Sequence, residues 1–153
     1  LLRHLERESH PTPRPKGHPF TDYTKFRLMK AINSDKAPKA IGPYSQAIQA
    51  NGFVFASGQL PIDPATGSFP EGGVKEQTRQ SILNAQAILK QAGLDLCDVV
   101  KTTVYLADMN DFAVMNEVYA QFFSEPFPAR SAIAVKTLPK QALVEVECIA
   151  ATK

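Results

Sequence analysis

The sequence predicts an α+β domain in which one mixed β-sheet carries two helices on one face. Two observations support this class. Short segments rich in β-branched residues alternate with two longer segments of helical periodicity, and an Asn-Gly pair separates two of the short segments. The predicted order is β-ββ-α-β-α-ββ. The 153 residues are 44% hydrophobic and 21% charged, which is enough apolar material for one core.

The strands before the first helix are predicted at residues 30–33 and within residues 47–59. Asn51-Gly52 lies between two apolar-rich runs, and both turn positions of a tight hairpin need a positive φ that these residues tolerate. Residues 61–73 are rich in Pro, Asp and Gly and are predicted to form a loop.

Two helices are predicted from apolar side chains that recur three or four residues apart. The first covers residues 74–92, with Gly93 as its C-terminal cap and the stripe Val74, Thr78, Ile82, Ala85, Leu89 and Ala92. Residues 98–107 are rich in β-branched residues and are predicted to form a strand. The second helix has Asn110 or Asp111 as its N-cap, ends before Pro126, and has the stripe Phe112, Met115, Val118, Tyr119, Phe122 and Phe123.

Two final strands are predicted at residues 131–136 and 143–150. If they pair with each other around residue 139, Glu145 lies opposite Ile133 and is offset from Arg130 by about 10 Å along the strand. Long side chains at these two positions could still converge on a small molecule. With both helices on one face, the other face of the sheet is apolar and uncovered, and we expect further copies of the chain to bury it.

The positive charge of the chain is concentrated at its N-terminus. The formal net charge is +2, but residues 1–30 alone have a net charge of +4, so the remainder is slightly acidic. The proline-rich residues 1–28 are predicted to be an appendage to a domain that spans residues 29–153. The appendage is either sequence ahead of a natural start at Met29 or a mitochondrial presequence, and its acidic residues argue against the presequence.

The positions of histidine and cysteine exclude several kinds of catalytic and metal site from the domain. All three histidines lie in the first 18 residues, so the domain has none for a Ser-His-Asp or Cys-His catalytic unit or a His-ligated zinc. Cys97 and Cys148 form no CxxC pair and are expected to be reduced thiols in a cytoplasmic protein. The acidic domain argues against a nucleic-acid surface, and no apolar run is long enough for a membrane span. We expect no metal.

Two charged positions are the first candidates for a site. Arg130 follows the proline-framed segment 126–129, and a guanidinium on a stiff backbone can hold a carboxylate through two parallel hydrogen bonds. Glu145 and Glu147 alternate with apolar residues, so they share one face of a strand, where a carboxylate could orient or deprotonate water. The competing interpretations are an arginine in a surface ion pair and a row of solvated carboxylates.

Four further residues are weaker candidates. Tyr44 follows a rigid Gly-Pro turn and could offer its hydroxyl to a pocket or pack on the edge of the core. Ser57 and Gly58 end a predicted strand, where glycine either lets a ligand approach the backbone or marks a bulge. Asn116 lies off the apolar stripe of the second helix and could simply be solvated.

Five segments together are similar to one protein family. They are GPYSQA (42–47), ASGQLP (56–61), VVKTTVYLADMNDF (99–112), PARS (128–131) and LPKQALVEVE (138–147). They resemble the Rid family, also called the YjgF family, and within it the reactive-intermediate deaminase A branch. The resemblance covers residues 30–151 with the segments in family order.

This resemblance implies a chorismate-mutase-like fold and a homotrimer with sites between adjacent subunits. It also implies hydrolysis of reactive 2-imino acids, such as 2-iminopropanoate and 2-iminobutanoate derived from enamines such as 2-aminoacrylate, to 2-keto acids and ammonia without a cofactor. By the same resemblance, Arg130 anchors the substrate carboxylate and Glu145 positions the attacking water. The other matched pocket positions are Tyr44, Ser57, Gly58, Asn116 and Ala132.

Two features depart from the family pattern. Ala132 stands where many members have cysteine, and because that position acts largely through its backbone we expect activity to survive. The segment 123–127 is short compared with some bacterial members, so the shape of the cleft rim and the breadth of substrates are not carried over from the family.

Two other functional classes remain open. Other Rid proteins are translation inhibitors that cleave RNA, regulatory partners or chaperones, but an acidic domain without histidine gives little support for RNA cleavage. A chorismate-mutase-like pericyclic catalyst would need several cations for a dicarboxylate, and residues 31–153 contain two arginines, Arg79 and Arg130.

Overall fold

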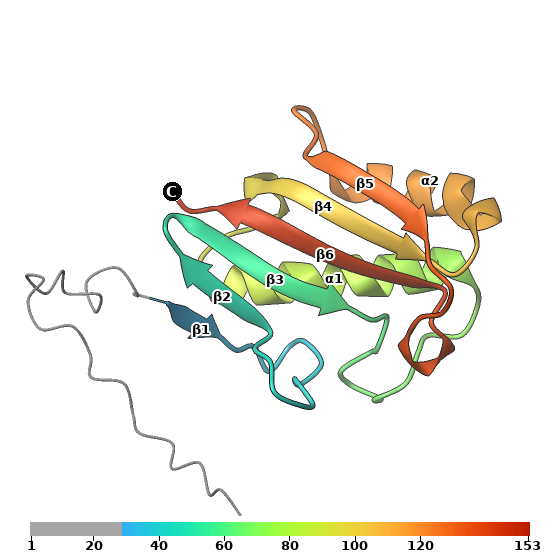
Figure 1. Cartoon of the computed structure of the whole chain (residues 1–153), viewed down its shortest axis with the longest axis horizontal. Coiled ribbons are helices and arrows are strands. Elements are labelled where there is room, and N and C mark those ends of the chain that lie inside the picture. The colour runs from blue at the N-terminus through green and yellow to red at the C-terminus, as the bar shows by residue number, and fades with distance from the viewer. Residues whose placement is uncertain (1–28) are drawn as a thin grey trace, which may run out of the picture.

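The computed structural model describes residues 29–153, and the predicted appendage at residues 1–28 lies outside the described residues. A six-stranded sheet of order β1-β2-β3-β6-β4-β5 packs against two helices on one face (Figure 1). The elements are β1 Lys30–Ile32, β2 Ala47–Ala50, β3 Phe53–Gln59, α1 Val74–Gln91, β4 Val99–Leu106, α2 Phe112–Phe122, β5 Ala129–Ala134 and β6 Val144–Ala151. The predicted α+β class, the element order and the placing of both helices on one face are confirmed.

Local turn chemistry determines where two of these elements meet or end. Asn51 and Gly52 have φ values of 50° and 81° and close the hairpin between β2 and β3. Gly93 has a φ of 76°, and its N–H donates to the Lys90 carbonyl at 3.0 Å while the N–H of Leu94 donates to Leu89 at 2.9 Å. These bonds satisfy carbonyls at the end of α1, as the predicted glycine cap requires.

Asp111 is the N-cap residue of α2, one of the two predicted positions, but the capping hydrogen bond comes from another side chain. A 3₁₀ turn at Met109–Asp111 leads directly into α2, and Asp111 makes no side-chain capping bond. Asp108 accepts the N–H of Asn110 at 2.9 Å instead. The cap lies earlier because the 3₁₀ turn and the helix form one continuous run whose free N–H groups begin at that turn.

The last two strands do not pair with each other. β6 lies between β3 and β4 and is antiparallel to both, whereas β5 pairs in parallel with β4. Ile133 and Glu145 are both level with Tyr105 but are separated by the width of β4. β5 returns beside β4 because α2 forms a crossover between them, and this leaves the more apolar β6 to take the buried central position.

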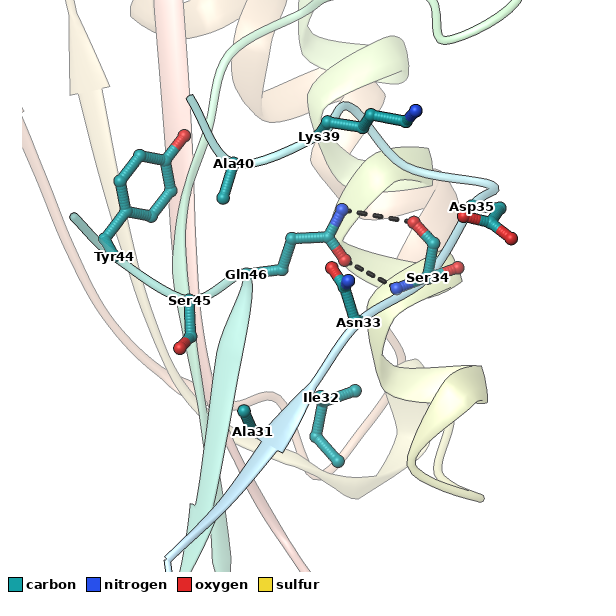
Figure 2. Close-up of a pocket in the computed structure, with 10 residues that line it drawn as sticks. All are labelled: Ala31, Ile32, Asn33, Ser34, Asp35, Lys39, Ala40, Tyr44, Ser45 and Gln46. Atoms are coloured by element: carbon teal, nitrogen blue, oxygen red, sulfur yellow. Dashed lines mark hydrogen bonds between the residues drawn. The ribbon is translucent and has the colours of Figure 1, made fainter. Parts of the chain in front are cut away.

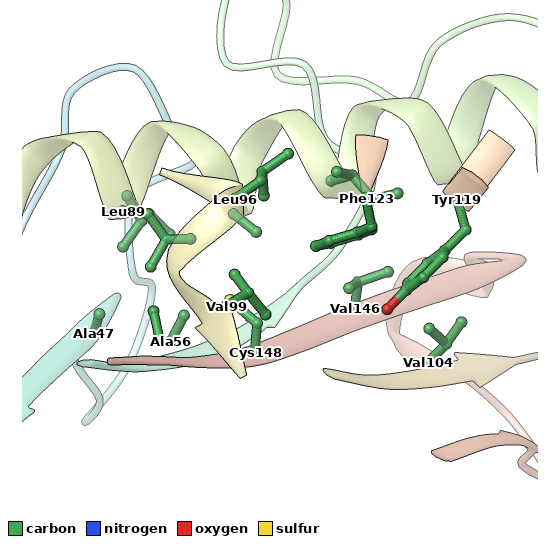
Figure 3. Packing of buried hydrophobic residues seen from close by; sticks show 14 of the residues in the cluster. Ala47, Ala56, Leu89, Leu96, Val99, Val104, Tyr119, Phe123, Val146 and Cys148 are labelled. Carbon is green, nitrogen blue, oxygen red and sulfur yellow. The ribbon is translucent and has the colours of Figure 1, made fainter. Parts of the chain in front are cut away.

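The hydrophobic core lies between the helices and the inner face of the sheet (Figure 3). Its largest fully buried apolar side chains come from both layers: Ile82, Ile88 and Leu89 of α1, Met115 and Val118 of α2, and Val54, Val104, Leu106, Val144 and Val146 of the sheet. Burial of each such side chain contributes about 1.5–3 kcal/mol. The rings of Tyr119 and Phe123 stack with their centroids 4.3 Å apart, which closes the core at the end of α2.

The outer face of the sheet is uncovered in a single chain. Phe53, Phe55 and Ile133 are on this face and are 40%, 45% and 48% exposed. Within residues 29–153 no helix is long and apolar enough to cross a bilayer. Its burial by further copies of the chain stays a prediction.

Candidate active site

The two charged candidates lie on opposite faces of the sheet. Arg130 is level with Thr102 and Cys148, both of which are buried on the inner face. Glu145 is level with Tyr105, and both side chains point to the outer face. They lie two strands apart and three residues along, about 10 Å in each direction. The convergence considered from the sequence therefore does not occur within one chain.

Arg130 is held against α2 by one hydrogen bond and two aromatic rings. Its Nη1 donates to Oδ1 of Asn116 at 2.7 Å, so Asn116 is a partner of the arginine as well as a solvated helix residue. The guanidinium lies 4.7 Å from the centroid of the Tyr119 ring and 5.6 Å from that of Phe112. Each such contact contributes about 0.5–1 kcal/mol at an exposed site. Because Asn116 is a neutral amide, this bond leaves the positive charge available for an anion.

Tyr119, whose ring lies beneath the Arg130 guanidinium, is held in place by a hydrogen bond to β4. Its hydroxyl shares a 2.7 Å hydrogen bond with the hydroxyl of Thr102, and burial raises the pKa of Tyr119 above its ordinary value. The phenol therefore stays neutral and keeps its ring under the guanidinium. A hollow of about 400 Å³ opens beside Arg130, with Phe127 as an apolar wall that is 57% exposed.

Glu145 belongs to a second hollow, of about 580 Å³. The candidate residues Tyr44, Ser57 and Gly58 line it together with Glu145, and so do Lys39 and Lys140. Four candidate positions from three separate segments of the chain thus meet in one place. Tyr44 is 53% exposed here, so about half of its surface is open to the hollow and to solvent.

Gly58 makes room for the Glu145 side chain. A Cβ at this position would lie 2.9 Å from Cδ and 3.2 Å from Cγ of Glu145, which is too close for either atom to remain in place. The register between β3 and β6 shifts between Ala56 and Gln59, so the predicted bulge is also present. Gly58 therefore serves the close approach of a carboxylate from the neighbouring strand.

Hydrogen bonds from three side chains position the walls of this hollow. The Ser57 hydroxyl donates to the Ser45 carbonyl at 2.6 Å and ties β3 to the segment that carries Tyr44. Gln46 accepts the N–H of Ser34 at 2.7 Å and donates to its carbonyl at 3.1 Å, as Figure 2 shows for the adjoining hollow that Tyr44 also lines. Across the sheet, Gln77 of α1 accepts the backbone N–H that precedes β6 at 2.8 Å. The start of β6, and with it Glu145, is thereby anchored to the helix layer.

Burial and a like charge act on the Glu145 carboxyl. The side chain is about half buried, and this loss of solvation raises its pKa. The negative charge of Glu147 raises it further. A carboxylate with raised proton affinity is a better proton acceptor than a fully solvated one.

One candidate residue lies outside both hollows, and three residues have roles or conformations that the sequence periodicity does not predict. Ala132 lies level with Val104, packs against the core and lines neither hollow. Tyr119 and Phe112 support the guanidinium but had been predicted only as part of an apolar helix stripe. Lys140 has a φ of 54°, which no local sequence signal indicates. Among residues 29–153 no cluster of three or more His, Cys, Asp or Glu side chains has a metal-binding arrangement.

Comparisons with known proteins add to this geometry. The sequence model of the endoribonuclease L-PSP family matches residues 34–152. A RutC family protein of Pyrococcus horikoshii is 57% identical, with 80% of this chain and 98% of that protein aligned. The 2-iminobutanoate/2-iminopropanoate deaminase of Bos taurus is 52% identical over 80% of this chain and 90% of its own length. The crystal structure of E. coli TdcF with bound serine has a TM-score of 0.77 at 46% identity and covers 81% of this chain and 99% of that chain.

Proposed function

The chain belongs to the Rid (YjgF) family, which the endoribonuclease L-PSP model describes, and we propose that it hydrolyses 2-imino acids such as 2-iminopropanoate and 2-iminobutanoate to 2-keto acids and ammonia. Relatives with about half of their residues identical carry this activity in their names. The observation that carries the proposal is the environment of Arg130. Its guanidinium lies over the rings of Tyr119 and Phe112 beside a hollow, and it donates a hydrogen bond to the neutral amide of Asn116.

Such an arginine suits the permanent charge that every 2-imino acid has. A guanidinium binds a carboxylate through two parallel hydrogen bonds, which contribute roughly 1.5–3 kcal/mol when one partner is ionised. The relative whose structure contains serine binds a molecule with a carboxylate next to a nitrogen-bearing carbon. In this proposal Arg130 anchors the carboxylate, and Phe127 and Ala120 face the short apolar side chain of the substrate.

Glu145 supplies the proton transfer that the hydrolysis needs. The carboxylate accepts a proton from water as the water oxygen forms a bond to C2 of the imine, and it returns that proton to the nitrogen. The second proton of the water then moves to the nitrogen as the C–N bond breaks and the C=O bond forms. The oxygen stays on the keto acid and both protons leave in ammonia, so no cofactor is consumed.

The site is complete only when two chains meet. Arg130 and Glu145 are on opposite faces of one sheet, so we infer that the Arg130 hollow of one subunit meets the Glu145 hollow of the next in a homotrimer. The exposed apolar side chains of the outer face are the surface that such an assembly would bury. Light scattering should then give three times the chain mass, and a stable monomer at micromolar concentration would remove the basis for an intersubunit site.

A coupled assay tests the activity directly. A serine/threonine dehydratase releases the enamine and imine from its amino acid, and keto-acid formation is followed with and without the protein. We expect faster keto-acid formation with the protein present. An unchanged rate at saturating protein would contradict the deaminase function and favour the regulatory or chaperone alternative.

A further inference from the structure

Glu145 is accompanied on the outer face by two groups that the proposed reaction does not use. Tyr105 lies directly opposite Glu145 on β4, and Glu147 follows two residues along β6 on the same face. The Tyr105 hydroxyl donates to Oε1 of Glu147 at 3.2 Å, a diagonal contact across the two strands. The Glu147 carboxylate is therefore held at one place, roughly 7 Å along the strand from Glu145.

Within one chain, two lysines and the phenol of Tyr44 share the hollow with Glu145, and the proposed trimer would add Arg130 of the next subunit. On the β3 side its neighbours are the uncharged Ser57 and Gly58. Lys39 and Lys140 line the hollow from two loops. Lys101, the remaining charge on the outer face of β4, donates to Ser131 of β5 at 3.5 Å and is directed away from β6. Glu147 is thus the like charge that its strand places next to Glu145.

We propose that Glu147, held by the Tyr105 hydroxyl, is a positioning residue that acts on the Glu145 carboxylate from the same face of β6. A fixed negative charge on the same face disfavours a second one, so it makes the Glu145 carboxylate a stronger base toward water. The consequence for catalysis rests on the proposed function, whereas the effect on Glu145 itself does not.

The Tyr105 phenol can keep this contact across the working pH range. Burial and then the charge of Glu147 raise the pKa of Tyr105 above its ordinary value, so its hydroxyl stays protonated and remains a donor. Because folding raises the pKa of Glu145, the ionised form that accepts a proton is present above that pKa and is lost as the pH falls through it. Removal of the Glu147 charge should therefore move the acidic limb of activity to lower pH.

The test is a carboxyl titration of the full chain by NMR with ¹³C-labelled glutamate, in which Glu145→Gln assigns the Glu145 signal. Glu147→Gln keeps the side-chain shape and removes the charge, and we expect the Glu145 midpoint to fall below that of the parent. Glu147→Asp keeps the charge and should retain part of the raised midpoint. Glu71→Gln, at an exposed residue in the loop before α1 that lines neither hollow, is the matched control and should leave the midpoint unchanged.

Two results would overturn the inference: an unchanged Glu145 midpoint in Glu147→Gln, or a midpoint in Glu147→Asp as low as in Glu147→Gln. The pH dependence of kcat/KM for 2-iminopropanoate supplies the second readout. Its acidic limb should shift with the titration midpoint in Glu147→Gln, with the plateau rate severalfold lower and KM unchanged. If the parent protein has no deaminase activity, the proposed function fails while the NMR result still decides the inference.

Discussion

The surroundings of Arg130 support the binding role that we propose for it. A charged side chain at the start of an edge strand would ordinarily move freely in water, but here two aromatic rings and the Asn116 amide restrict it. Pre-organisation of this kind lowers the entropy that is lost when a ligand binds. We expect lysine to be a poor substitute at this position, since an ammonium cannot form the two parallel bonds of the planar guanidinium.

We expect Arg130→Ala to abolish the acceleration of 2-iminopropanoate hydrolysis and Arg130→Lys to recover little of it. The matched control is Arg79→Ala, because Arg79 is exposed, donates to Gln121 at 3.0 Å and lies away from both hollows. Keto-acid formation in the coupled assay is the measurement, with a circular dichroism melt to verify folding. Parent-like activity in a folded Arg130→Ala variant would disprove the carboxylate anchor.

The position of the Glu145 side chain depends on the absence of a side chain at Gly58 of the neighbouring strand. In Gly58→Ala the new methyl group would displace the Glu145 carboxylate, and the backbone can accept alanine because Gly58 does not have a positive φ. We expect a folded protein whose kcat falls at least about tenfold, within the range for loss of a positioned base. Gly73→Ala, with open space around its Cβ, is the control and should leave kcat unchanged.

At the scale of elements, the caps and the order of strands decide how the sheet presents its residues. α1 must end sharply for the chain to turn into β4, and Gly93 provides that end through a left-handed conformation. β6 then carries Glu145 and Glu147 at the centre of the sheet, where β3 and β4 hold it on both edges.

Gly93→Ala should lower the free energy of unfolding by about 1–2 kcal/mol, because a φ of 76° is unfavourable for a residue with a Cβ. No neighbouring atom lies within 4 Å of that Cβ, so the loss comes from backbone strain alone. Thermal denaturation should show a Tm that is a few degrees below that of the parent. The deaminase rate at 25 °C should match the parent, and a parent-like Tm would argue against this account of the cap.

At the scale of the whole molecule, the opposite faces of Arg130 and Glu145 predict complementation between inactive chains. Arg130→Ala and Glu145→Gln are each expected to be inactive alone. In trimers assembled from an equal mixture, about a quarter of the sites would combine an intact arginine from one subunit with an intact glutamate from the next.

Co-expression of the two variants, followed by the coupled assay on the mixed trimer, measures this recovery. Activity near a quarter of the parent value is the expected result. A mixture as inactive as its components would mean that each site is built within one chain. A double variant, Arg130→Ala with Glu145→Gln, mixed with the parent chain provides the reference for dilution of intact sites.

Features governed by neighbouring residues were determined by the sequence itself. The Asn51-Gly52 turn, the Gly93 cap and the apolar stripes of both helices depend on contacts within a few positions, so the elements were predictable to within about two residues. The motifs around Arg130 and Glu145 also identified the family before any geometry was known.

Tertiary structure alone decided which strands adjoin and which faces the candidate residues share. The insertion of β6 between β3 and β4 depends on contacts among segments distant in the chain, and it separates Arg130 from Glu145 by the sheet itself. The same packing places the ring of Tyr119, a residue that helical periodicity assigns to the core, beneath the guanidinium of Arg130. The local sequence pattern indicates that a side chain is buried. The residues against which it packs are determined only by the tertiary fold.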